Sequence, residues 1–157
     1  MSVVLEKNFN LGKIHFDLHK ELNRAAGTIV KDIKNKVASG QSVSGGTLKP
    51  LKPATIKAKR KKGSPRPNVA LYDTGRMAGS GSKKGVGGRG VFLSDPATKQ
   101  NQTATISTAQ DRQDIGTYHN EGAGNLPKRE WFGISKKASK DAFRMIELRV
   151  EQMLRDA

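Results

Sequence analysis

The chain contains one glycine pattern that, by its letters alone, fits a dinucleotide site. Residues 85–90 read Gly-Val-Gly-Gly-Arg-Gly, which is a GxGxxG arrangement. In a dinucleotide site the glycines follow a strand, open a helix and are followed about 20 residues later by an acidic side chain. Here they lie inside a stretch rich in glycine and lysine and run directly into an expected strand. We therefore interpret the pattern as a loop and expect no nucleotide cofactor.

The histidines are the other residues that suggest chemistry. His15 and His19 lie four residues apart, a spacing that would place them on one face of a helix, but no third ligand lies near them in sequence, so we interpret them as solvated helix residues and not as a metal site. His119 stands beside Tyr118 and close to Glu121, a set suited to acid–base catalysis. No nucleophile, oxyanion donor set or second histidine accompanies it. We therefore expect neither an enzyme nor a metal site.

Composition sets broader bounds. The 157 residues are enough for one domain, and we predict a single domain over residues 1–157. The absence of cysteine excludes disulfides and thiolate metal sites. The first eleven residues lack the apolar core of a signal peptide, and no run approaches the ~20 apolar residues that span a bilayer. We expect a soluble protein, made and used in a cytoplasm, with no membrane contact.

The positive charge is concentrated in one part of the chain. Residues 49–90 hold twelve lysines and arginines against Asp73 alone, so they carry a net +11 of the total +15. Such a block contacts a polyanion, orders against an acidic protein partner, or is a solvated charged loop, and the sequence leaves these three open. We call the residues expected to present this charge the basic loop: Lys57, Lys59, Arg60, Lys61, Lys62, Arg66, Lys83, Lys84 and Arg89.

The segment that contains the basic loop has little regular pattern. Residues 40–90 are rich in glycine, proline and lysine, with short helical turns expected only at 55–60 and 71–77. We expect Met77 to face the core. About fifty residues without strong structure exceed what a compact domain normally contains. We therefore predict a flexible insertion over residues 40–90 that becomes ordered when the protein assembles.

Two amphipathic helices flank this segment. Residues 16–37 place apolar side chains at steps of three or four, and Ser39-Gly40 is a helix stop. Gly27 weakens the middle of this helix and suggests a close helix crossing. A second helix is predicted over 139–155, with Ser135 or Ser139 as its N-cap.

Three short strands complete the expected domain. Residues 91–94 and 102–107 have strand composition, with Ala104 and Ile106 predicted to face inward, and 116–120 is predicted as the third strand. We therefore predict the α+β class: a small antiparallel sheet packed by an N-terminal and a C-terminal amphipathic helix, with long flexible basic loops.

Residues 116–133 have the composition of a structural joint. Gly116 and Gly122 permit positive φ or close backbone approach, and Trp131 with Phe132 supplies a large apolar anchor before the last helix. We expect both aromatic residues to be buried, either under the C-terminal helix or in a subunit contact.

Three segments resemble a known family. Residues 71–77 match L-x-x-T-G-x-[LM] in full, residues 118–122 match Y-A-x-x-[HQ]-x-x-G in part, and residues 126–133 match [IL]-P-x-R-x-[FW]-[LF]-G. In the second segment His119 stands where alanine is usual. These segments, in this order, resemble the tail-completion or virion morphogenesis proteins of tailed bacteriophages, which are small neck proteins at the head–tail junction.

The resemblance implies a structural virion protein assembled in the host cytoplasm. It implies a homo-oligomeric ring, a hexamer, that caps the tail and meets the head connector and the tail-tube or terminator proteins. DNA would pass through the lumen without sequence-specific binding. The residues expected at the partner or subunit interface are Tyr118, His119, Glu121, Pro127, Arg129, Trp131 and Phe132.

The alternative function is that of a small basic nucleic-acid-binding protein. The positive charge supports it. The basic block lacks the aromatic side chains on which single-stranded nucleic acids stack, and no recognised binding motif is present. We therefore rank it second.

Overall fold

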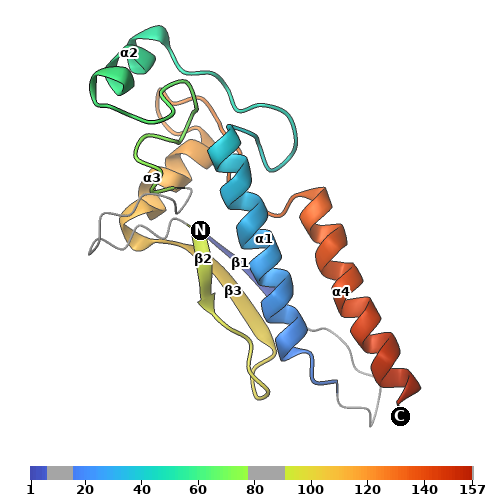
Figure 1. Cartoon of the computed structure of the whole chain (residues 1–157). Helices are drawn as coiled ribbons and strands as arrows, with labels where there is room; N and C mark the ends of the chain where they lie inside the picture. The colour runs from blue at the N-terminus through green and yellow to red at the C-terminus, as the bar shows by residue number, and fades with distance from the viewer. Residues whose placement is uncertain (7–15, 78–90, 157) are drawn as a thin grey trace.

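The computed structural model describes residues 1–6, 16–77 and 91–156 (Figure 1). Within them the chain forms three strands and four helices. In chain order these are β1 (Ser2–Glu6), α1 (His19–Ser39), α2 (Pro53–Lys61), β2 (Val91–Asp95), β3 (Thr103–Thr108), α3 (Gln110–Glu121) and α4 (Lys136–Arg155). The predicted α+β class is confirmed. His15, the GxGxxG pattern and the basic-loop residues Lys83, Lys84 and Arg89 lie outside the described residues.

The sheet is antiparallel and has the order β1-β3-β2. Its central strand, β3, alternates between buried and half-buried residues, and Ala104 and Ile106 are fully buried, as predicted. Ile106 pairs with Val3 on one side and with Leu93 on the other. The alternation follows from the two-residue period of a strand with one face on the core.

The third strand differs from the prediction. Residues 116–120 are not a strand but belong to α3, and the third strand is β1, which the sequence analysis does not predict. Helix α3 ends at Gly122, whose φ of 79° is the left-handed conformation that glycine adopts most easily at a helix C-terminus. The Thr117-Tyr118 pair favours a strand locally, but in the structure these residues are helical and Trp131 packs against Gly116, where a Cβ would lie 2.7 Å from its Cζ2.

The helices add two layers to one side of the sheet. One face of α1 packs on β2 and β3, and α4 packs on α1, antiparallel to it (Figure 1). Helix α4 thus contacts the sheet through α1 and not directly, whereas we expected both helices on the sheet. Gly40 at the C-terminus of α1, with φ 71°, confirms the predicted helix stop. The expected close crossing at Gly27 is wrong, because nothing lies within 4 Å of the position its Cβ would take.

The segment from residue 40 to residue 77 lies at the end of the molecule where α1 finishes (Figure 1). Helix α2 confirms the predicted turn at 55–60, since it begins at Pro53 and covers that range. Residues 71–77 form turns and bends instead of the predicted helix, although Met77 is buried as expected. Leu71 has φ 62°, an unfavourable backbone conformation for a residue with a bulky side chain. Flexibility of the insertion before assembly stays a prediction.

Candidate functional site

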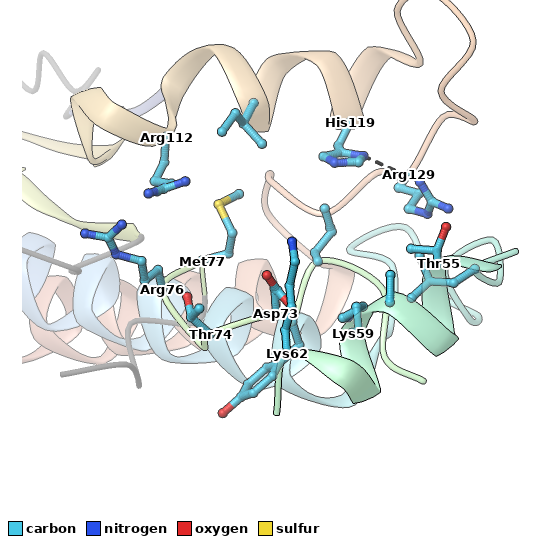
Figure 2. A pocket seen from close by; sticks show the side chains of 15 residues that line it. Thr55, Lys59, Lys62, Asp73, Thr74, Arg76, Met77, Arg112, His119 and Arg129 are labelled. Carbon is cyan, nitrogen blue, oxygen red and sulfur yellow. Dashed lines mark hydrogen bonds between the residues drawn. The ribbon is translucent and has the colours of Figure 1, made fainter. Parts of the chain in front are cut away.

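The three segments that carry the family resemblance meet around one pocket. Residues 71–77, His119 of α3 and Arg129 of the loop before α4 all line it, together with side chains of α2 (Figure 2). The pocket has a volume of about 540 Å³. Segments more than forty residues apart in the sequence therefore form one structural unit at the end of α1.

Trp131 fixes the loop before α4 against α3. Its indole Nε1 donates a hydrogen bond to the carbonyl oxygen of Gly116 at 2.8 Å, and the side chain is fully buried. A Cβ at Gly116 would lie 2.7 Å from Trp131 Cζ2, so only glycine allows this approach. Asn120 Oδ1 accepts the backbone N–H groups of Trp131 and Phe132, each at 3.1 Å. The predicted burial of Trp131 and Phe132 is confirmed, and the indole packs on α3.

Arg129 joins the same loop to the segment before α2. Its side chain donates from Nε to the carbonyl oxygen of Lys49 at 3.0 Å and from Nη2 to that of Pro50 at 3.4 Å. Its Nη1 lies 3.5 Å from Nδ1 of His119. Burial lowers the pKa of Arg129, which is only 5% exposed. Burial, and secondarily the charge of Arg129, also lower the pKa of His119, so this imidazole favours its neutral form.

The described basic-loop residues do not form a uniform charged surface. Lys59 is only 8% exposed, and its Nζ donates to the carbonyl oxygen of Val69 at 2.7 Å. Burial lowers its pKa, and Asp73 partly offsets this. Arg66 donates to the carbonyl oxygen of Ala38 and stacks 5.0 Å from the centre of the Tyr72 ring. Lys57, Arg60, Lys61 and Lys62 are exposed.

The residues predicted at an interface separate into two groups. Tyr118 is 52% exposed and Glu121 is also exposed, so both lie on the surface of the subunit. Arg129, Trp131 and Phe132 are buried inside it. His119 and Pro127 are half-buried. Of this set, the side chains of Tyr118 and Glu121 are the most accessible to another chain.

Part of the pocket lining was not predicted from the sequence. Arg112 and Ile115 lie on α3 at positions that share a face with His119, since they precede it by seven and four residues. Arg76 also lines the pocket, from the turn at residues 76–77. A helix predicted over residues 110–121 would have placed Arg112, Ile115 and His119 on one face. The strand predicted at 116–120 does not bring these three side chains together.

The guanidinium Nη1 of Arg129 lies 3.5 Å from His119 Nδ1, and this cationic group cannot act as a proton acceptor. Among the residues that the structure describes, no three histidine, aspartate or glutamate side chains gather as a metal site does. Within the same ranges, no helix is both long enough and apolar enough to cross a membrane.

Comparison with known proteins gives no relative: no family model, curated protein or solved structure matches this chain.

Proposed function

We propose that this chain is a structural subunit of the neck of a tailed bacteriophage, where copies of it form a ring. The ring completes the tail and couples it to the head connector. DNA passes through its lumen without being recognised by sequence. The action is mechanical, because the subunit closes a symmetric assembly and presents a surface to the proteins on either side.

The observation that carries the proposal is the convergence of the three resembling segments. Residues 71–77 and 126–133 contribute to the pocket lining, and residues 118–122 supply both His119 and the Asn120 amide that holds the Trp131 loop. Residues 118–122 and 126–133 are neighbours in sequence, so the informative part of this convergence is that residues 71–77, more than forty residues earlier, line the same pocket. Residues 118–122 and 126–133 are hydrogen-bonded to each other, since the Arg129 N–H donates to the carbonyl oxygen of His119 and Asn120 Oδ1 accepts the N–H groups of Trp131 and Phe132.

The exposed side of α4 supports self-association. Phe143 is 65% exposed and Leu154 48% exposed, and with Ile146 and Val150 they lie at helical spacing along one flank. Ile146 and Val150 pack partly on the core, so the apolar stripe continues from the core onto the surface. An exposed apolar stripe on a helix is typical of a protein contact. In a ring, its occupant is the neighbouring copy.

The test is the assembly state of the purified protein. We expect native mass spectrometry and negative-stain electron microscopy to show rings, either of the protein alone or after mixing with the tail-tube and head-connector proteins encoded by adjacent reading frames. Phe143→Ser should reduce ring formation while leaving the circular dichroism spectrum of the subunit unchanged, since Phe143 is mostly exposed.

The competing result has a distinct signature. A monomer under every condition, with affinity for DNA that falls steeply with salt, at about −0.9 in log–log slope per phosphate contacted, would favour a nucleic-acid-binding protein. The exposed lysines and arginine of α2 are the residues through which such binding would occur.

A further inference from the structure

The pocket holds more positive charge than its own residues neutralise. Its described lining includes five cationic side chains and one carboxylate, that of Asp73. The cationic residues are Lys59, Lys62, Arg76, Arg112 and Arg129. Partly buried charges are costly unless they are paired or hydrogen-bonded. The pocket therefore favours an anionic occupant.

Two of the five cations, Lys62 and Arg76, are available to such an occupant, and Arg112 is ion-paired with Asp111 but keeps an Nε without a hydrogen-bond partner. Lys59 and Arg129 donate to backbone carbonyl oxygens, as described above. The backbone N–H of Lys62 donates to the carbonyl oxygen of Ala58, but within the described residues the side chains of Lys62 and Arg76 make no hydrogen bond and no ion pair. Arg112 lies 3.2 Å through Nε from an Asp111 carboxylate oxygen, but this N–H is not aligned with it and has no hydrogen-bond partner, although the side chain is only 23% exposed.

The two arginines face each other. Figure 2 shows the side chains of Arg76 and Arg112 pointing toward one another across one end of the pocket. Two guanidinium groups in this arrangement repel unless an anion lies between them. Arginine binds carboxylate with paired, charge-assisted hydrogen bonds, so two converging guanidinium groups suit one carboxylate well.

The apolar part of the lining indicates what carries the carboxylate. Leu51, Leu71, Met77 and Ile115 belong to the lining, so the pocket suits a ligand with an apolar group beside its charge. A nucleic acid strand would instead need a track of evenly spaced cations and aromatic faces for stacking. The aromatic residue of the lining is Tyr72, and Arg66 already lies over its ring.

We propose that this pocket binds an acidic peptide segment of a partner protein, with one carboxylate between Arg76 and Arg112 and a neighbouring apolar side chain against the apolar residues of the lining. Lys62 lies at the exposed rim and attracts the segment through its charge. The proposal depends on the pocket alone and holds whether or not the protein acts in a phage neck.

The test uses a fluorescein-labelled peptide in which glutamates flank leucines, and the same peptide with glutamine in place of glutamate. We expect the full-length protein to bind the glutamate peptide and to bind the glutamine peptide at least about tenfold more weakly, as loss of charge-assisted hydrogen bonds predicts. Arg76→Gln/Arg112→Gln should weaken glutamate-peptide binding by about tenfold or more. Arg76→Lys/Arg112→Lys should weaken it less, because charge is kept while paired hydrogen bonds are lost.

The matched control removes the same charge nearby. Lys57→Gln/Lys61→Gln lies on α2 but outside the pocket lining, and should change binding by less than about twofold. Equal weakening by this control would overturn the proposal, as would no binding of the glutamate peptide to the wild-type protein. Tighter binding of a single-stranded DNA oligonucleotide, lost in the arginine pair variant, would assign the pocket to nucleic acid instead. Thermal melts of each variant verify that it is folded.

Discussion

At the scale of single residues, Gly27 and Gly116 are both helical glycines, but a methyl group added at each would meet different surroundings. Gly27 is exposed on α1 with nothing within 4 Å of its would-be Cβ, whereas that of Gly116 would meet Trp131 at 2.7 Å. Gly27→Ala should therefore raise the free energy of unfolding by about 0.5–1 kcal/mol. Gly116→Ala should lower it by about 1–3 kcal/mol through overpacking.

Urea unfolding of the two variants beside the wild type measures both changes. Because the substitution is the same, any difference in sign comes from the surroundings. A stabilising effect of Gly116→Ala would mean that the indole of Trp131 moves away at little cost.

His119 makes stability depend on pH in a defined direction. Burial, with a smaller contribution from Arg129, lowers its pKa in the folded state below the ordinary value of 6.5. The unfolded chain therefore binds a proton at higher pH than the folded chain does. Well above pH 6.5, His119 is neutral in both states and does not make the free energy of unfolding depend on pH. As the pH falls through about 6.5, the unfolded chain is protonated first, so the free energy of unfolding decreases until the folded-state pKa is reached. Urea midpoints between pH 7.5 and pH 5 should fall more for the wild type than for His119→Gln.

Subtracting the pH profile of His119→Gln from that of the wild type removes the contribution of carboxylates that titrate in the same range and leaves that of His119. Parallel pH profiles for wild type and His119→Gln would contradict the expected contribution.

At the scale of elements, Ser135 both begins α4 and attaches it to α1. Its Oγ accepts the backbone N–H of Ala138 at 3.1 Å and donates to Asp32 Oδ2 of α1 at 2.7 Å. Ser135→Ala should cost about 1–2 kcal/mol of unfolding free energy, because a helix cap and a partly buried hydrogen bond are both lost. Ser139→Ala, one turn further along, is the matched control and should change stability by less than about 0.5 kcal/mol. Denaturant titrations that show equal losses would assign no special role to the cap.

The elements also show where sequence reasoning succeeds. Helices α1 and α4 have long apolar periods, and β3 alternates cleanly, so each was predictable within a few residues. Helix α3 was not, since its buried position along the helix is Gly116, which contributes no apolar signal. The pocket was not predicted for the same reason, because Arg112, Ile115 and His119 come together only on a helix. Arg76 reaches them only through the tertiary fold.

At the scale of the whole molecule, the exposed charge of α2 should serve assembly rather than DNA packaging. Lys59 is buried and bonded to Val69, so reversing its charge would unfold the region and is not informative. Reversal at the exposed Arg60 and Lys61 of α2 and at Lys62, which directly follows it, should leave DNA-filled heads intact and block head–tail joining, because an acidic partner surface is then repelled. Electron micrographs of infected cells complemented with the variant should show separate heads and tails.

The control for this prediction reverses three exposed lysines elsewhere: Lys20, Lys31 and Lys99. It changes the net charge equally and should permit joining. Failure of joining in both variants would indicate that overall charge, and not the position of α2, matters.

The pairing of β1 with β3 constrains the order of folding. Ser2 pairs with Ser107, so the edge strand closes a loop of about a hundred residues before it contributes to the sheet. Hairpin-like pairing of β2 with β3 and formation of α1 are far more local. Closure of long loops is slow relative to local pairing. During synthesis β1 therefore remains an unpaired apolar strand until β3 has emerged, and in that interval it is the segment most exposed to pairing with another chain.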